Sequence, residues 1–372
     1  MRADIGQLLW LGFEGPRVPS WLRRRLDAGT IGGTILGAGN LTCSLDPGGG
    51  LPQELCDLDA LIALNRELHR AAPDGTPALI AIDQEGGAVQ RIRAPATQWP
   101  PMRAHDGLDP PADAALAEQI GRAVGLELRA LGLDVDLAPV LDVHTNPANP
   151  VIGDRAFGRE PEAVARRALA FARGLAAAGV LPCGKHFPGH GDTHADSHLE
   201  LPRVAHDRDR LARIELLPFA RAVAADIPML MTAHVVFDAL DAAHPATLSA
   251  PILTGLLRRQ LRYRGVIVSD DLTMRAIAGR MDPGAAAASA IEAGCDILLI
   301  CRDEPLQAAT EAGLLRAAER SAALRHRISE SAARVRAMKR AHAASLRRLP
   351  PPPASVIGQF EHRRLADRLA GR

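Results

Sequence analysis

Eight short apolar runs, rich in β-branched residues, recur along this 372-residue chain and limit its fold more than any other feature. Each has the length and composition of a strand that is buried on both faces. The runs lie at residues 8–13, 33–36, 78–82, 135–141, 180–185, 229–236, 266–269 and 297–300. Between many of them lie amphipathic stretches that predict helices, at residues 58–71, 112–130, 161–178, 207–225, 251–261 and 283–293.

Strands that alternate with helices favour parallel βα units, which build either a closed (β/α)8 barrel or an open doubly wound sheet. The number of runs matches the barrel. In addition, the first run is not followed by the GxGxxG segment that is typical of open dinucleotide-binding sheets. We therefore predict the α/β class and a TIM-like (β/α)8 barrel with a single domain.

The end of the chain differs in composition from the rest. Residues 304–345 are rich in Ala, Arg and Glu and predict helices, and a run of prolines at 350–353 then interrupts the helical pattern. We predict a catalytic barrel with C-terminal helices over residues 1–345 and a Pro/Arg-rich tail over residues 346–372. The tail could be a docking helix or a frayed end, and the sequence leaves both open.

The charge and the cysteine content limit which partners the protein is expected to bind and in which cellular compartment it is expected to act. The 44 basic and 43 acidic residues nearly cancel, so no overall field favours nucleic acid or an anionic membrane. No run approaches the ~20 apolar residues of a membrane span. The five cysteines are odd in number and form no CxxC pair, which predicts reduced thiols. We expect a cytoplasmic monomer that acts on a small molecule and binds neither nucleic acid nor membrane.

Ionisable side chains gather directly after several predicted strands. In a barrel these positions meet at one face, where reacting groups of such enzymes stand. Sugar recognition needs carboxylates that accept from hydroxyls and cations that donate to ring substituents, and candidates for both roles occur here: Asp83, Arg91, Arg155, Lys185 and His186. Lys185 is informative because the chain has only two lysines among its 44 basic residues.

Two further segments carry candidates for bond cleavage. Asp270 follows a buried run and could attack an anomeric carbon or stabilise an oxocarbenium ion, whereas Asp271 is the better candidate for a helix N-cap. Asp196 and His198 are two residues apart in a loop, where the carboxylate could orient and charge the imidazole for acid–base work. We expect no cofactor and no metal.

One alternative rests on four histidines spaced four residues apart: His186, His190, His194 and His198. On a helix they would share one face and predict a metal site. However, Pro188, Gly189 and Gly191 interrupt any helix there, so the spacing has no helical meaning. A metal-dependent barrel hydrolase remains a minor alternative, and a non-catalytic sugar-binding protein is a second.

Four ordered motifs carry a family resemblance. Residues 185–192 (KHFPGHGD), continuing to Asp196 and His198, resemble the signature of bacterial β-N-acetylhexosaminidases of glycoside hydrolase family 3. The other matches are residues 82–87 (IDQEGG) with 89–91 (VQR), residues 155–158 (RAFG) and residues 268–274 (VSDDLTM).

The resemblance implies a barrel enzyme that removes terminal β-linked N-acetylglucosamine with retention of configuration. It implies Asp270 as the nucleophile, His198 as the general acid/base and Asp196 as its partner. It further implies that the sugar is held by Asp83, Arg91, Arg155, Lys185 and His186. The compact chain resembles cytoplasmic enzymes of peptidoglycan recycling that act on 1,6-anhydro-muramyl peptides. A neutral histidine base would tolerate an anionic acceptor, so phosphorolysis on the same site remains an alternative.

Overall fold

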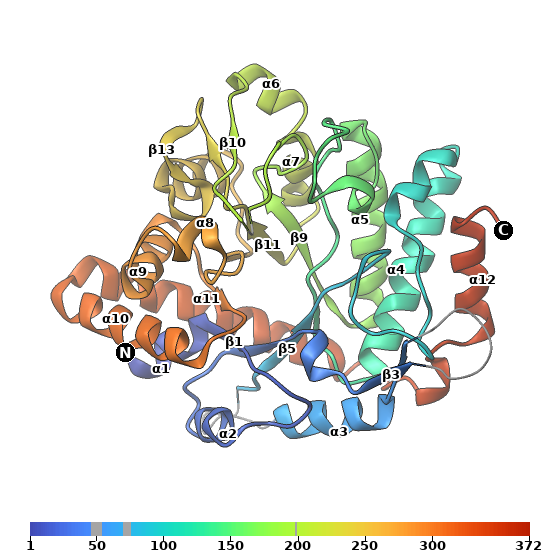
Figure 1. Ribbon diagram of the computed structural model, residues 1–372, viewed down its shortest axis with the longest axis horizontal. Helices are drawn as coiled ribbons and strands as arrows, with labels where there is room; N and C mark the ends of the chain where they lie inside the picture. The colour runs from blue at the N-terminus through green and yellow to red at the C-terminus, as the bar shows by residue number, and fades with distance from the viewer. Residues whose placement is uncertain (46–53, 70–75, 198) are drawn as a thin grey trace.

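The computed structural model describes residues 1–45, 54–69, 76–197 and 199–372 (Figure 1). Eight strands form one parallel sheet, in the order β14–β11–β9–β8–β5–β2–β1–β15. Their bounds are β1 (Leu9–Gly12), β2 (Gly33–Leu36), β5 (Leu79–Ile82), β8 (Val135–Asp136), β9 (Leu181–Phe187), β11 (Met229–Thr232), β14 (Val266–Val268) and β15 (Leu298–Ile300). Each predicted run overlaps one of these strands, and β9 extends beyond its run to Phe187.

The two ends of this sheet meet. Val268 at the end of β14 forms a parallel bridge with Ile297, the residue before β15. The Ser269 amide also donates to the Ile297 carbonyl oxygen at 2.8 Å. The predicted (β/α)8 barrel is therefore confirmed, and the open doubly wound sheet is excluded.

The sheet has two apolar faces, as a barrel requires. Trp10 and Leu79 belong to the cluster inside the barrel, whereas their chain neighbours Leu9 and Ile80 belong to the larger cluster beneath the helices. Successive side chains of a strand point to opposite faces, so strands buried on both faces must be apolar throughout. This requirement explains why the barrel strands could be recognised in the sequence as apolar runs.

Several predicted strand boundaries were wrong. Regular pairing in the run 135–141 is confined to β8, because Pro139 has no amide to donate, although Val140 pairs again with Lys185. The run 229–236 also divides. Its last residue begins β12 (Val236–Phe237), which joins β10 (Arg203–Val204) and β13 (Asp241–Pro245) in a small separate sheet.

Three predicted helices have the predicted bounds: α4 (Ala112–Ala130), α5 (Pro161–Ala178) and α9 (Pro283–Ala293). The predicted helix 207–225 is instead two helices, α6 (Arg208–Arg213) and α7 (Leu217–Ala224). Pro218 lies in the first turn of α7, where its missing amide hydrogen costs no helical bond. The stretch 251–261 forms the π-helix η5 (Pro251–Gln260), and 58–71 forms α3 (Leu58–Leu68), with residues 70 and 71 outside the described residues.

The remaining elements connect or cover the barrel. They are α1 (Arg2–Leu8), α2 (Ser20–Asp27), η1 (Ala38–Asn40), β3 (Cys43–Leu45), β4 (Glu54–Cys56), β6 (Gln84–Gly86), β7 (Val89–Gln90), η2 (Met102–Gly107), η3 (Gly153–Arg155), η4 (Ala246–Leu248), α8 (Arg275–Ala278), α10 (Glu304–Arg320), α11 (Ala322–Leu346), η6 (Ala354–Val356) and α12 (Phe360–Leu369). The predicted helical stretch 304–345 thus corresponds to α10 and α11.

The C-terminal tail docks on the barrel's helical layer. Helix α12 lies beside α4 (Figure 1). The buried Glu127 of α4 accepts hydrogen bonds from the Gly358 amide at 3.0 Å and from His362 Nδ1 at 2.8 Å. Because these bonds satisfy a buried carboxylate, the tail is a docked helix and not a frayed end.

The prediction that the cysteines are reduced was wrong for one pair. Cys43 and Cys56 form a disulfide. They stand directly opposite one another in the antiparallel pair β3 and β4, a register that a separation of 13 residues does not reveal. Cys183, Cys295 and Cys301 are free. The cysteine count therefore no longer supports a cytoplasmic location. In the described parts of the chain no helix is long and apolar enough to cross a membrane.

Candidate active site

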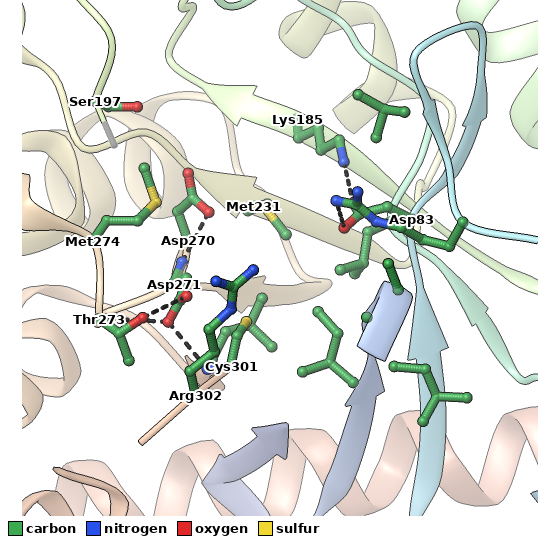
Figure 2. Close-up of a pocket in the computed structure, with 18 of the residues that line it drawn as sticks. Asp83, Lys185, Ser197, Met231, Asp270, Asp271, Thr273, Met274, Cys301 and Arg302 are labelled. Carbon is green, nitrogen blue, oxygen red and sulfur yellow. Dashed lines mark hydrogen bonds and ion pairs between the residues drawn. The ribbon is translucent and has the colours of Figure 1, made fainter. Parts of the chain in front are cut away.

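A cavity of about 800 Å³ opens at the carboxyl ends of the barrel strands. Six of the predicted site residues line it together, drawn from four barrel strands or the loops that follow them: Asp83, Arg91, Arg155, Lys185, His186 and Asp270. Figure 2 shows Asp83 with Lys185 on one side of this space and Asp270 on the other. Residues from distant parts of the sequence thus converge as the barrel rule predicts.

Lys185 is the centre of a buried ion cluster. Its side chain is 3% exposed, and its ammonium donates to Asp83 Oδ1 at 2.7 Å and contacts Glu85 Oε1 at 2.6 Å. Arg155 holds the same Glu85 carboxylate with two parallel bonds, both of 2.8 Å. This fork fixes the plane of the carboxylate and leaves Lys185 pinned between two acids.

The charges of this cluster stabilise one another. Burial alone would raise the pKa of Glu85, but Arg155 and Lys185 hold it at about 2. Burial likewise opposes the charge on Asp83, yet Lys185 and Arg91 keep the pKa of Asp83 below its usual range. All of these groups are charged at neutral pH, so the cavity presents fixed donors and acceptors to a polar ligand.

A further carboxyl group lies beneath the cluster in the neutral state. Asp136 of β8 is fully buried, and its Oδ1 accepts from the Gln84 amide at 3.0 Å. Burial raises the pKa of Asp136 to about 8, because its hydrogen bond and the charge of Lys185 only partly offset desolvation. The protonated group adds no third negative charge beside Asp83 and Glu85.

His186 is oriented by the carboxylate of Asp142, which lies in the segment after the neighbouring strand β8. Its Nδ1 lies 2.7 Å from Asp142 Oδ2, and Asp142 Oδ1 also accepts from the His190 amide at 2.7 Å. Burial would raise the pKa of Asp142, but His186 lowers it, so Asp142 is ionised. This pairing places the proton on Nδ1 and leaves Nε2 as the second ring nitrogen of His186.

Asp270 stands at the end of β14 on a rigid support. The preceding Ser269 is buried, and its hydroxyl oxygen accepts from the Leu299 amide of β15 at 3.0 Å. One Asp270 oxygen accepts from the Asp271 amide at 2.8 Å. His234 Nε2 in turn donates to the Asp271 carbonyl oxygen at 3.0 Å. The carboxylate is therefore anchored from both sides while it faces the cavity.

Asp271 does not cap a helix, and that prediction was wrong. Helix α8 begins at Arg275, and Asp271 lies too far upstream. Its carboxylate instead accepts from the Thr273 amide at 3.0 Å, the Thr273 hydroxyl at 2.7 Å and the Cys301 amide at 3.1 Å. Asp271 therefore fastens the loop after β14 to the end of β15.

Buried hydrogen bonds link residues of the loop after β9 to one another. His190 Nδ1 pairs with the Thr193 hydroxyl at 2.8 Å, and His190 Nε2 pairs with the Ser197 hydroxyl at 3.0 Å. Ser197 lines the cavity, and Asp196 next to it is half-buried and is not a lining residue. His198 lies outside the described residues, so its predicted role and its pairing with Asp196 stay predictions.

The four-residue histidine spacing does not correspond to a metal site in the described residues. Both nitrogens of His190 are engaged by hydroxyl groups, His186 pairs with Asp142, and His194 is exposed beside Asn146. Within the described part of the chain, no group of three or more His, Cys, Asp and Glu side chains is placed to hold a metal ion.

Buried His190 should make the stability depend on pH. Burial and the neighbouring His186 lower its pKa to about 4, below the value of the unfolded chain. Its contribution is therefore complete above about pH 6.5 and is lost as the pH falls towards 4. Between pH 7 and pH 4, the wild type should lose about 2–3 kcal/mol more free energy of unfolding than His190→Gln, as urea denaturation would measure. Equal losses in both proteins would contradict this assignment.

Sequence reasoning missed several residues that position the site. Glu85 lies in the IDQEGG motif and Asp142 directly follows the run 135–141, but nothing in the sequence showed that they pair with Arg155 and His186. Thr247 of η4, which pairs with His234 Nδ1 at 2.7 Å, carries no sequence signal at all, because η4 is not one of the barrel strands or the segments that directly follow them.

Comparisons with known proteins agree with this geometry. Residues 1–338 match the family model "Glycosyl hydrolase family 3 N terminal domain". "Beta-hexosaminidase" from Alkalilimnicola ehrlichii is 41% identical over 297 residues, which are 79% of this chain and 80% of that protein. "Beta-hexosaminidase A" from Pseudoalteromonas piscicida is 39% identical over 342 residues, and the matched region covers 83% of this chain but 55% of that longer protein.

Solved structures extend the likeness to the whole chain. A glycoside hydrolase family 3 β-N-acetylglucosaminidase from Paenibacillus sp. has a TM-score of 0.88 at 37% identity and covers 100% of this chain and 68% of its own. NagZ from Neisseria gonorrhoeae has a TM-score of 0.69 at 31% identity and covers 88% of this chain and 98% of its own. This chain therefore belongs to glycosyl hydrolase family 3, in the group that contains the bacterial β-N-acetylhexosaminidases.

Proposed function

We propose that the protein is a retaining exo-β-N-acetylglucosaminidase that releases terminal non-reducing N-acetylglucosamine. The natural substrates in this proposal are N-acetylglucosaminyl 1,6-anhydro-muramyl peptides of cytoplasmic peptidoglycan recycling. The observation that carries the proposal is the buried cluster of Asp83, Glu85, Lys185 and Arg155 across one cavity from Asp270. Such a cluster offers charged partners to the hydroxyls of one terminal sugar, within reach of a carboxylate.

The proposed reaction has two steps. In the first, Asp270 attacks the anomeric carbon, the bond to the aglycone oxygen breaks, and His198 gives its proton to that oxygen. In the second, neutral His198 takes a proton from water, the water oxygen attacks the anomeric carbon, and Asp270 leaves as a carboxylate. Asp196 would stabilise the protonated imidazole in the first step. Two inversions give net retention.

The geometry of the described residues supports the proposed sugar-binding roles. Asp83 is half-buried at the cavity wall and keeps oxygen lone pairs beyond those that Lys185 and Arg91 use. Arg155 and His186 line the same wall. We assign the hydroxyl groups of the terminal sugar to these charged acceptors and donors, because their partners inside the protein already fix them in place.

Product analysis with an aryl β-N-acetylglucosaminide tests this function. We expect free N-acetylglucosamine, released first as the β-anomer when followed by proton NMR, and equal rates before and after chelator treatment. With phosphate present, the same product should form. Sugar 1-phosphate as the main product would establish the phosphorylase alternative. Loss of activity with the chelator would favour a metal-dependent hydrolase. Absence of any turnover would favour a sugar-binding protein without catalytic activity.

The Asp196–His198 pair should behave as one unit. Each single alanine variant should lose most of the acid catalysis, and the double variant should be little worse than His198→Ala, because groups acting together are non-additive. Protonation matters most for poor leaving groups, so a dinitrophenyl glycoside should lose far less in its first step than a sugar aglycone. The measurement is kcat/KM for the three variants across leaving groups. A loss that is independent of the leaving group, or fully additive losses, would show that His198 is not the acid/base.

A further inference from the structure

The docked C-terminal tail is linked to the candidate active site through the buried carboxylate of Glu127. Besides the bonds from Gly358 and His362, this carboxylate accepts from the Thr97 hydroxyl at 2.5 Å and from the Thr97 amide at 3.1 Å. Gly358 has a φ of +62°, and a Cβ atom there would lie 2.0 Å from the Pro95 carbonyl oxygen. The tail is therefore tied closely to the segment around Thr97.

That segment in turn supports the β6–β7 hairpin. Gln90 of β7 is buried, its amide nitrogen donates to the Thr97 carbonyl oxygen at 3.1 Å, and its amide oxygen accepts from the Trp99 amide at 3.0 Å. Gly87, between the two strands, donates its amide to the Trp99 carbonyl oxygen at 2.9 Å. Three hydrogen bonds thus hold the hairpin against the segment that the tail contacts.

Arg91 follows this hairpin directly and depends on it for its position. Its side chain lines the cavity and is 38% exposed, and in the described part of the chain its one ion pair is a 3.5 Å contact with Asp83. The other cations of the cluster are held by ion pairs of 2.8 Å or less. The next residue, Ile92, is fixed at its amide and its carbonyl oxygen by the Gln84 side chain, at 3.0 Å and 3.1 Å. The place of Arg91 is therefore set mainly by the backbone on either side of it.

We infer that the C-terminal tail positions Arg91 for substrate binding, with Glu127 and His362 as positioning residues outside the cavity. This inference rests on the proposed function, in which Arg91 helps to hold the terminal N-acetylglucosamine. A long side chain on a loosely held backbone has to be ordered when it binds, and this ordering lowers the affinity. The buried bonds from tail to hairpin reduce this cost before the sugar arrives. Loosening the tail should thus weaken substrate binding and leave the reaction at Asp270 unchanged.

The test removes the contact between the tail and Glu127 and follows KM and kcat separately. His362→Leu keeps an apolar side chain at this position but loses the donor. We expect it to raise KM for an aryl β-N-acetylglucosaminide about fivefold with kcat within about twofold, since one positioned hydrogen bond is worth about this factor. His362→Asn, whose amide nitrogen can donate in place of Nδ1, should restore KM. Gly358→Ala displaces the same part of the tail and should reproduce the effect of His362→Leu.

A double variant shows whether the effect passes through Arg91. Arg91→Gln alone should raise KM about tenfold, and adding His362→Leu should raise it little further, because the tail then has no guanidinium group to position. Two controls accompany it. Lys339→Arg, at a buried site away from the cavity, should leave KM unchanged at an equal loss of melting temperature. Arg364→Gln removes an exposed charge from the same helix, α12, and should change neither KM nor kcat.

Three outcomes would overturn the role of the tail and leave the glycosidase function in place. The first is a wild-type KM in both His362→Leu and Gly358→Ala. The second is a set of losses that multiply in the double variant, which would show that the tail acts elsewhere. The third is an equal rise of KM in Lys339→Arg, which would assign the tail to stability alone. Failure of wild type to cleave any β-N-acetylglucosaminide would instead refute the proposed function itself.

Discussion

Asp270→Asn should lower kcat for an aryl β-N-acetylglucosaminide on the order of 10⁴-fold or more, because the amide cannot form the covalent glycosyl intermediate. The protein should remain folded. Asn keeps an oxygen that can accept from the Asp271 amide, and the supports from Ser269 and His234 are untouched. The measurements are kcat and the melting temperature of the purified variant.

Two comparisons make this result specific. Asp271→Asn should cost far less activity, because Asp271 binds the loop and not the sugar. Asp270→Gly should regain turnover in azide and yield the α-linked glycosyl azide, since the anion can enter where the carboxylate was. Activity of Asp270→Asn within tenfold of wild type, with a stable fold, would exclude Asp270 as the nucleophile.

Lys185→Arg should lower kcat/KM about 10²-fold or more, although the charge is unchanged. The Lys185 ammonium sits between Asp83 Oδ1 and Glu85 Oε1, at 2.7 Å and 2.6 Å, in a space where the side chain is 3% exposed. A planar guanidinium group cannot occupy this position without displacing the two carboxylates that we expect to orient the sugar. Displacements of about 1 Å at such positions lower the reaction rate by about this factor.

The second lysine of the chain provides a matched control. Lys339 of α11 is as deeply buried, and its ammonium donates to Gln7 Oε1 at 2.8 Å and to the Gly32 carbonyl oxygen, away from the cavity. Lys339→Arg should lower the melting temperature by a similar amount but leave kcat/KM unchanged. Parallel effects of both variants on kcat/KM would show that Lys185 acts only through stability.

The barrel could be predicted from the sequence because its strands have to be apolar on both faces. Trp10 and Leu79 fill its interior while Leu9 and Ile80 meet the helices, so each strand appears as a continuous apolar run. Local exceptions were not visible. Pro139 interrupts the pairing of β8 through its missing amide, which is a property of register and not of hydrophobicity.

Six of the residues that line the cavity were also predictable, because strand ends of a barrel meet at one face. What the sequence could not supply was the pairing within it. Glu85 and Arg155 are 70 residues apart, and Asp142 and His186 are 44 apart. Such contacts depend on the tilt of the strands and on the course of the loops. The residue types alone carry no information about either. The Cys43–Cys56 disulfide was missed for the same reason.

The most direct test of the proposed mechanism is to trap its covalent intermediate. Wild-type protein is incubated with a slow fluorinated N-acetylglucosaminyl substrate that has a good leaving group, digested, and examined by peptide mass spectrometry. We predict one added sugar on the peptide that contains Asp270, with fragmentation that places it on that carboxylate, and no label in Asp270→Asn. A label on Asp271 or on another residue, or complete turnover with inversion and no label, would contradict the mechanism.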